Sequence, residues 1–199
     1  TISGVTLAGA DAGNYTLTPP LGITASITPA ALTVSGLTAS NKVYDATTAA
    51  TLSGTATLGG ILLTDVVTAS GGTGSFADKN VGTAKPVTVT GVTLGGADAG
   101  NYTVTPPVGL TANITPASLT LSGLTASNKV YDATTAATLA GTPTLGGILL
   151  SDVVTASGGT GAFADKNVGT AKPVTISGVT LAGADAGNYT LTPPLGITA

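Results

Sequence analysis

The sequence predicts an all-β protein built from tandem antiparallel β-sandwich modules of 87 residues. Three observations support this fold class. The chain repeats itself, because residues 32–112 match residues 119–199 at 70 of 81 positions and residues 1–25 match residues 175–199 throughout. Thr, Val, Gly and Pro are abundant whereas Glu, Arg and Met are absent, which favours strands and turns over helices. Apolar residues alternate with Thr over residues 87–94, as expected for a half-buried strand.

Cutting the repeat at its Ile-Thr-Pro-Ala segment divides the chain into three parts. Residues 1–29 hold the C-terminal part of a module, residues 30–116 form a full module, and residues 117–199 form a second module without its final linker. An array of near-identical small modules is what a fibre, stalk or spacer requires. We expect residues 1–29 to form a strand over residues 1–7, a corner and a hairpin, in a sheet completed outside residues 1–199.

Within the first full module we expect roughly seven to nine short strands separated by Gly- and Pro-rich turns. They are predicted over residues 32–37, from residue 42, and over residues 50–58, 87–94, 103–105 and 110–114. Residues 61–67 form a short apolar run interrupted by Asp65, and residues 71–74 predict a turn. The alternation of residues 87–94 shifts by one position at Gly91, which predicts a β-bulge. No stretch shows a helical period.

Composition excludes several classes of function. Only 8% of residues are charged and the net charge is −3, without a basic patch, so we expect no nucleic-acid partner. No apolar stretch is long enough for a transmembrane helix, and the absence of Cys excludes disulfides. His is absent as well, so the usual nucleophile–base pairs cannot form. We therefore expect no enzymatic activity, no cofactor and no metal.

The segment Asp-Ala-Gly-Asn-Tyr is the most specific local signal and occurs three times at intervals of 87 residues. It resembles the tyrosine corner of immunoglobulin-like sandwiches, in which a Tyr hydroxyl bonds to upstream backbone. The candidate structural site therefore comprises three pairs: Asp11 with Tyr15, Asp98 with Tyr102, and Asp185 with Tyr189. We expect Asp98 to cap the amides of its turn and Gly100 to adopt a conformation that side chains resist. The alternative is a ligand site formed by Asp98, Asn101 and Tyr102.

Three longer phrases extend the resemblance to almost a whole module. In chain order they are SNKVYDATTAATL, SFADKNVGTAKPVTVTGVTLGGADAGNYTV and ITPAS. Together they resemble the YDG/MBG-type tandem repeat of large bacterial surface or filamentous-haemagglutinin-like adhesins. One departure is Ala at positions 46 and 133, where that family often has Gly, so the turn after Tyr44-Asp45 is expected to differ. The resemblance implies an extracellular or cell-surface bacterial location with an adhesion or biofilm role, and it brings no catalytic residues.

The sequence thus predicts a structural segment of a secreted or surface-attached bacterial fibre, stalk or adhesin shaft. Its expected partners are neighbouring modules or chains, with surface glycans as a further candidate. The alternative function is a carbohydrate- or receptor-binding adhesion module. Binding modules would more plausibly diverge in a loop, whereas the two modules differ mainly by mild exchanges such as Val/Leu, Thr/Ser and Gly/Ala.

Four smaller alternatives rest on single features. Loops around Asp78 and Asp98 offer oxygens for calcium, although calcium prefers several carboxylates at close spacing. Asn113 could join a Lys in an isopeptide crosslink, and the Thr-x-Thr runs are similar to ice-binding faces. Asn-x-Thr sequons, which occur at Asn14, Asn101, Asn113 and Asn188, are glycosylation acceptors in some proteins and backbone-capping residues in most.

Overall fold

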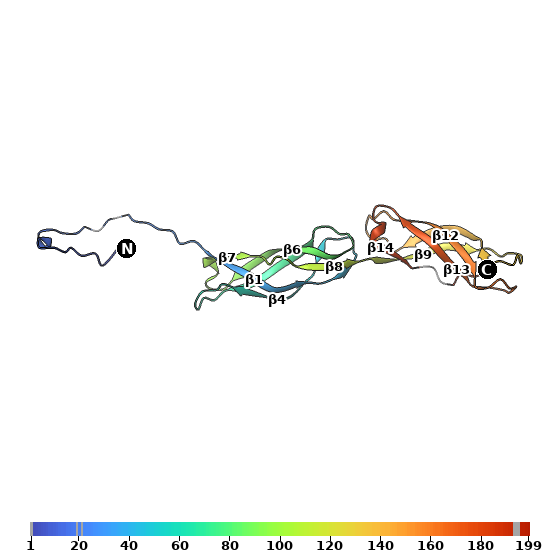
Figure 1. Cartoon of the computed structure of the whole chain (residues 1–199), viewed down its shortest axis with the longest axis horizontal. Coiled ribbons are helices and arrows are strands. Elements are labelled where there is room, and N and C mark those ends of the chain that lie inside the picture. The colour runs from blue at the N-terminus through green and yellow to red at the C-terminus, as the bar shows by residue number, and fades with distance from the viewer. Residues whose placement is uncertain (1, 19, 21, 193–195) are drawn as a thin grey trace.

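The computed structural model describes residues 2–18, 20, 22–192 and 196–199. Strands dominate these residues, and no α-helix occurs among them. The strands form two successive modules arranged in a line, preceded by an extended N-terminal segment (Figure 1). The predicted all-β fold and tandem organisation are therefore confirmed.

The first module contains two sheets. Its strands are β1 (Ala30–Ala39), β2 (Lys42–Val43), β3 (Ala49–Ala50), β4 (Leu52–Gly59), β5 (Thr68–Phe76), β6 (Gly82–Gly95), β7 (Tyr102–Thr105) and β8 (Thr111–Thr115). One sheet has the order β4-β1-β7 and the other the order β2-β8-β6-β5-β3. Most neighbours are antiparallel as predicted, but β1 pairs with β7 and β2 pairs with β8 in parallel.

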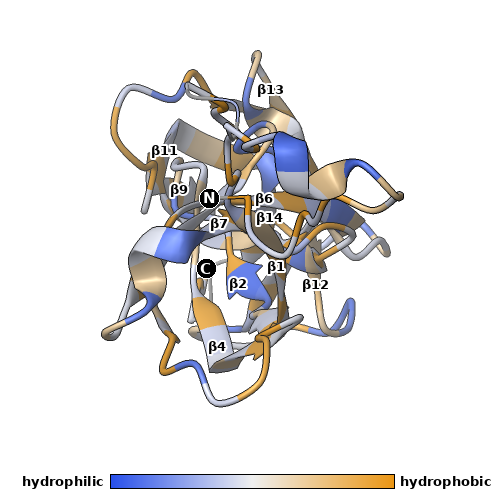
Figure 2. Ribbon diagram, turned by 90° about the vertical axis from the view of Figure 1, so that its left-hand side faces the viewer, coloured by the Kyte–Doolittle hydropathy of each residue, from blue (hydrophilic) through white to orange (hydrophobic). Residues whose placement is uncertain are grey.

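The second module repeats this arrangement. Its strands are β9 (Ala117–Ala126), β10 (Ala136–Ala137), β11 (Leu139–Gly146), β12 (Thr155–Phe163), β13 (Val174–Ala182) and β14 (Tyr189–Thr192). They form sheets with the orders β11-β9-β14 and β10-β12-β13, and Pro173 makes an isolated antiparallel bridge to Thr198. In the view along the long axis, labelled strands of both modules fall within one outline (Figure 2), so the modules follow one another rather than lie side by side.

The predicted change of phase at Gly91 occurs, but the predicted bulge does not. Val87 and Val89 are buried before Gly91, and the inward positions after it are Val92 and Leu94. Nevertheless β5 and β6 stay in unbroken register, because β5 changes phase at the same level. Gly71 and Gly91 both have a φ near +74° (74° and 73°), a left-handed conformation that Gly adopts at little cost. Two matched glycines thus replace the extra residue of a bulge.

The turn predicted at residues 71–74 is wrong, because these residues lie inside β5. Their three glycines suggested a chain reversal, whereas they allow close approach to β3, β4 and β6. A Cβ at Gly74 would lie 2.8 Å from the carbonyl oxygen of Ala50. The apolar run at residues 61–67, which contains Asp65, forms the loop between β4 and β5.

The N-terminal segment does not form the expected strand and hairpin. Among its described residues the structure contains only a 3₁₀ turn, η1 (Ala12–Asn14), and no strand. Thr1 and Pro19, at which the expected strand and hairpin begin, lie outside the described residues. The apolar side chains expected to face water do so; they are Val5, Leu7, Tyr15, Leu17, Ile23 and Ile27. A short edge without partner strands cannot bury an apolar face.

Candidate functional site at the module junction

The two modules are joined by a single residue and meet in a polar contact. β8 ends at Thr115, β9 begins at Ala117, and only Pro116 lies between them. We call the contact the junction and define it by eight residues: Tyr44, Lys79, Asn80 and Val81 of the first module, and Asp152, Asp185, Asn188 and Tyr189 of the second. Seven of them lie in loops or at strand ends, and Asn188 is the last residue of the 3₁₀ turn η3 (Ala186–Asn188).

Lys79 is the positive centre of the junction. Its Nζ lies 2.5 Å from Oδ1 of Asp152 and 2.9 Å from Oδ1 of Asp185. The Asp152 side chain is only 1% exposed, so its charge is removed from water. A buried carboxylate is stable only when paired and hydrogen-bonded, and here the cation comes from the neighbouring module.

Two tyrosines complete the shell around Asp152. The hydroxyls of Tyr44 and Tyr189 each donate to Oδ2 of Asp152, both at 2.7 Å. Their rings pack edge to face with centroids 5.3 Å apart, and Nζ of Lys79 lies 5.8 Å from the Tyr44 ring centroid. Edge-to-face aromatic contacts and a cation over a ring both add to the attraction.

Asn188 forms a second set of hydrogen bonds across the junction. The backbone N–H of Val81 donates to Oδ1 of Asn188 at 2.9 Å, and Nδ2 of Asn188 donates to Oδ1 of Asn80 at 3.1 Å. Asn188 is buried, and both ends of its amide are satisfied by the first module. Because a side-chain amide has a fixed donor and acceptor side, this contact is directional.

Electrostatics at the junction favour the charged pair. Burial alone would raise the pKa of Asp152, but hydrogen bonds from Lys79, Tyr44 and Tyr189 hold that pKa below its ordinary value. The pKa of Asp185 is lowered mainly by a hydrogen bond from the backbone N–H of Val153, and next by the hydrogen bond from Lys79. Hydrogen bonds to Asp152 and Asp185 raise the pKa of Lys79. Burial raises the pKa of Tyr189 to about 12, and the hydrogen bond to Asp152 is the second largest cause of this rise.

An apolar core runs through the junction. One continuous cluster joins Tyr44, Phe76 and Ile114 of the first module to Leu119 and Tyr189 of the second. By contrast, Leu32, Val67 and Tyr102 at the far end of the first module form a separate small cluster. The packing unit therefore crosses the sequence boundary between modules.

The YDG domain family matches the chain twice, over residues 28–109 and 115–195. The chain belongs to the YDG domain family. No curated protein and no solved structure matches it. The two matched segments correspond to the two strand modules, so the junction lies between two consecutive YDG domains.

Each YDG domain carries both halves of the junction, one at each end. At the open end of the second domain, the counterparts of Tyr44 and Lys79 are Tyr131 and Lys166. Tyr131 is 56% exposed, whereas Tyr44 is 2% exposed. At the opposite end of the first domain, Asp65 and Asp98 are the counterparts of Asp152 and Asp185, and Asn101 is exposed where Asn188 is buried. The same sequence is thus buried or exposed according to whether a neighbour is present.

In each YDG domain, both members of the predicted pair, Asp98 with Tyr102 and Asp185 with Tyr189, accept backbone N–H groups of the same upstream apolar loop. The Tyr102 hydroxyl accepts the N–H of Leu62 at 3.1 Å and donates to Asp65 at 2.6 Å. The Tyr189 hydroxyl accepts the N–H of Leu149 at 3.0 Å in the same way. These bonds reach upstream backbone, and the tyrosine-corner assignment stays a prediction. Asp11 and Tyr15 form no such arrangement with the described residues, and Tyr15 is 71% exposed.

Two details of the predicted corner are wrong. Asp98 forms no capping hydrogen bond to its own turn, because Oδ2 accepts the N–H of Val66 at 2.8 Å instead. Asp98 therefore links its own turn to the loop that contains Val66, and does not cap its own turn. Gly100 does not adopt a left-handed conformation, and open space surrounds the position of a Cβ there. The turn needs no glycine at this site.

Sequence reasoning missed Lys79, Asp152 and Asn188 as parts of one site. The signal that could have found them is the Asp in each apolar loop, Asp65 and Asp152, since an acid there requires a polar partner. No group of three or more metal-ligating side chains occurs in the part of the chain that the structure describes, and no helix there is long and apolar enough to cross a membrane. Asn113, the crosslink candidate, accepts the N–H of Ala84 at 2.7 Å.

Proposed function

We propose that the chain is a structural spacer in which YDG domains stack end to end through a repeated polar junction. The observation that carries this proposal is the pairing of Asp152, 1% exposed, with Lys79 and Tyr44 of the preceding domain. Each domain supplies a cation and a phenol at one end and two carboxylates at the other. The two ends of a domain are therefore complementary, so that identical domains can stack in series, as a shaft requires.

The junction also fixes how one domain is oriented on the next. A single linking residue limits the span, and the hydrogen bonds of Asn188 and Asp152 come from different directions. Removing either partner of a buried charge pair leaves an uncompensated charge, so sliding or twisting at this contact is costly. Stacking with a defined angle distinguishes a stiff rod from beads on a flexible string.

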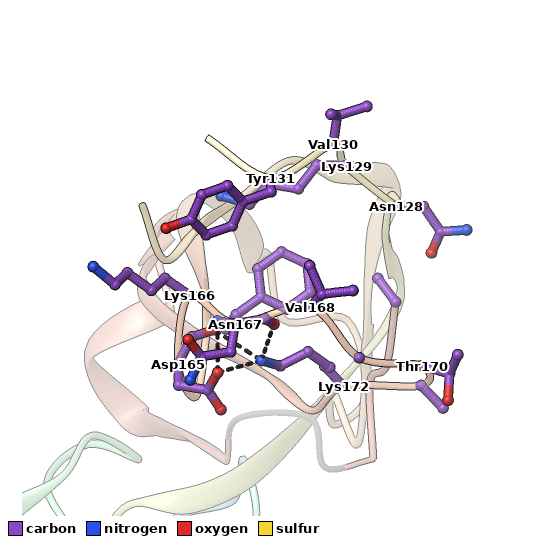
Figure 3. Close-up of a pocket in the computed structure, with 14 residues that line it drawn as sticks. Asn128, Lys129, Val130, Tyr131, Asp165, Lys166, Asn167, Val168, Thr170 and Lys172 are labelled. Carbon is purple, nitrogen blue, oxygen red and sulfur yellow. Dashed lines mark hydrogen bonds and ion pairs between the residues drawn. The ribbon is translucent and has the colours of Figure 1, made fainter. Parts of the chain in front are cut away.

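The surface around Tyr131 in the second domain corresponds to a covered surface in the first domain, which favours stacking over ligand binding. The surface in the second domain includes Tyr131, Phe163 and Val168 (Figure 3). In the first domain the corresponding surface is covered by β8 and by the second domain. A carbohydrate- or receptor-binding site at this position would be blocked in every domain that has a successor.

We place this spacer in a secreted or surface-attached bacterial fibre, stalk or adhesin shaft. Support for that setting comes from the resemblance to repeats of bacterial surface proteins. Low charge and Thr-rich outward faces are compatible with a long exposed shaft. Its chemistry is mechanical, and no catalytic role is proposed.

The spacer proposal is tested by whether the two domains move as one body. We expect backbone ¹⁵N relaxation of the chain, at a dilution where it is monomeric, to give one rotational correlation time for residues 30–192. Lys79→Ala should separate this into two faster values, because Asp152 and Asp185 lose their cation. Lys166→Ala is the matched control at the open end, and it should leave the single value unchanged.

Independent tumbling of the two domains in the unaltered chain would overturn the proposal. Equal effects of Lys79→Ala and Lys166→Ala would do so as well, since the junction would then be irrelevant to stiffness. Far-ultraviolet circular dichroism of both variants checks that each domain keeps its strands.

A further inference from the structure

The first and the last stretch of the first domain lie side by side in parallel. We call residues 30–43, which contain β1 and β2, the entry run, and residues 102–115, which contain β7 and β8, the exit run. β1 pairs with β7 in one sheet and β2 pairs with β8 in the other, both in parallel. In both pairings each residue meets the residue 72 positions later, as Ala30 meets Tyr102. The two runs therefore keep one register along the domain, although each of them changes sheet.

Hydrogen bonds join the two runs at both ends of the domain. Near the start, the parallel ladder of β1 and β7 connects them. Near the end, the N–H of Asn113 donates to Oδ1 of Asn41 at 2.7 Å, and the N–H of Tyr44 donates to the carbonyl oxygen of Thr115 at 2.8 Å. The entry and exit runs are thus attached to each other over the whole length of the domain.

The first and the last strand of this domain are both internal strands. β1 lies between β4 and β7, and β8 lies between β2 and β6. These two strands also carry Leu32, which is 0% exposed, and Ile114, which is 1% exposed, the largest fully buried side chains of the domain. Sliding either strand along its neighbours would break hydrogen bonds on both sides and would withdraw an apolar side chain from the core.

The path of the chain determines how tension would act on these strands. The chain enters the first domain at one end and leaves it at the other, and β1 and β8 extend along this direction (Figure 1). β8 continues through Pro116 alone into β9, the first strand of the second domain. Tension would therefore pull the entry run by its first residue and the exit run by its last residue. Because the two runs are parallel, this slides one past the other and loads all the bonds between them at once.

We propose that the entry and exit runs form a shear clamp, which gives each YDG domain a further function, carrying tension along the chain without unfolding. Resistance to force depends on the barrier to unfolding rather than on the free energy of unfolding, so a domain with a small core can still be strong in this direction. The second domain begins with the same parallel pairing, of Ala117 with Tyr189. This inference deepens the proposed function and rests on it, because a clamp is of use only where domains are joined in series.

Single-molecule force spectroscopy in two pulling directions tests the clamp. The chain has no Cys, so two introduced Cys residues at exposed positions set the points of attachment. The shear pair is Thr28→Cys with Ser118→Cys, which lie on either side of the first domain in the chain. The peel pair is Thr28→Cys with Thr64→Cys, which pulls the start of β1 away from the end of β4. These two strand ends are antiparallel neighbours, so their bonds open one after another.

We expect the shear pair to unfold the first domain at a force at least about twofold above that of the peel pair at the same loading rate, because the bonds of the clamp must break together. Both attachments act on the same fold, so a difference in force reports the direction of pulling and not the stability of the domain. Far-ultraviolet circular dichroism checks that both Cys variants keep their strands.

Removal of one bond between the runs tests which contacts carry the load. Asn41→Ala should raise the unfolding rate under a fixed shear load about fivefold, because the N–H of Asn113 loses its acceptor in the entry run. Ser70→Ala is the matched control, since it removes an exposed hydrogen bond to Thr93, between β5 and β6 and outside both runs. It should leave that rate unchanged.

Equal unfolding forces for the two attachment pairs, or a lower force for the shear pair, would overturn the clamp. Equal effects of Asn41→Ala and Ser70→Ala under shear would count against it too, since the runs would then not bear the load. These outcomes are separable from the spacer proposal, which is tested without load. If the two domains tumble as one body while the two forces are equal, the spacer stands and the clamp fails. If they tumble independently while the shear force is higher, the clamp stands as a property of the single domain and the stacking fails.

Discussion

At the scale of single residues, each tyrosine of the repeat occurs in both buried and exposed settings. Tyr189 and Tyr15 occupy the same position of the 87-residue repeat, and both follow Asp-Ala-Gly-Asn. Tyr189 is buried and its hydroxyl joins Leu149 and Asp152, whereas Tyr15 is exposed. The pair separates the effect of a phenol hydroxyl in its site from its effect elsewhere in the same local sequence.

Tyr189→Phe should therefore destabilise the second domain by about 1–3 kcal/mol, because the N–H of Leu149 and the carboxylate of Asp152 each lose a partner. Tyr15→Phe should change stability by less than about 0.5 kcal/mol. Urea unfolding followed by circular dichroism measures both. Tyr102→Phe should act in the direction of Tyr189→Phe, and a neutral result at both buried positions would remove the tyrosine-corner assignment.

The burial of a residue in one copy of the repeat and its exposure in another also explain which residues of the site could be predicted. Asp98, Tyr102, Asp185 and Tyr189 were found because their turn is a local sequence pattern. Lys79 and Asp152 are 73 positions apart, and the Lys occurs in an identical phrase at Lys166, which forms no ion pair with the residues that the structure describes. Local sequence carries no information on which copy of a repeat is covered, so only the tertiary arrangement distinguishes them.

At the scale of elements, the turn after β2 is held in a conformation that its sequence does not favour. Ala46 and Ala133 both have φ of 61°, in the left-handed region. Ala stands here where the resembled family often has Gly, and it adopts the left-handed conformation that Gly favours. The expected difference from the turn of the family stays a prediction. The carboxylate of Asp45 accepts both the N–H and the hydroxyl of Thr47, each at 2.9 Å, and these bonds hold the turn.

Ala46→Gly should therefore stabilise the first domain, by up to about 1 kcal/mol, since a left-handed L-residue costs about 1–2 kcal/mol and Gly loses part of that in entropy. Ala49→Gly in the neighbouring strand β3 should have the opposite sign, at about 0.5–1 kcal/mol. Thermal unfolding of the two variants measures the sign of each change in stability relative to the unaltered chain. Destabilisation by Ala46→Gly would mean that the turn carries no strain.

Strands were predicted well where apolar residues alternate, and poorly where Gly is dense. β8 was expected within one residue of its observed bounds, and the strand expected over residues 87–94 is the C-terminal part of β6, which begins at Gly82. β5 was missed because Gly71, Gly72 and Gly74 resemble a turn, although their missing side chains allow close packing against β3, β4 and β6. A glycine chosen for space cannot be told from a glycine chosen for a turn without knowledge of the neighbouring strand.

At the scale of the whole molecule, the repeat in the sequence and the unit of packing are out of step. The sequence divides near Pro116, yet the larger core cluster joins residues on both sides of that point. A module that shares its core with its successor gains apolar burial that a domain of this size lacks alone. This explains how a chain so poor in aromatic residues holds its shape, and it predicts that the two domains unfold together.

Acid should weaken this coupling through Asp152. Its folded pKa lies below the ordinary value, so its stabilisation is present above about pH 4 and is lost as the pH falls through the folded pKa. Asp45, Asp78, Asp132 and Asp165 also have lowered pKa values, so overall stability falls in acid for several reasons. A substitution at Asp152 is needed to separate the contribution of the junction to acid stability from that of the other carboxylates.

Asp152→Asn provides that comparison. The variant should be less stable than the unaltered chain at neutral pH, because Lys79 loses its closest carboxylate. The difference in urea midpoint should shrink below about pH 4, where Asp152 becomes neutral as well. For the phenols, stability falls as the pH rises instead of as it falls. The raised pKa of Tyr189, about 12, means that its stabilisation is present below about pH 10 and is lost between these values. A difference between the two proteins that persists unchanged to pH 2 would show that the charge of Asp152 does not hold the domains together.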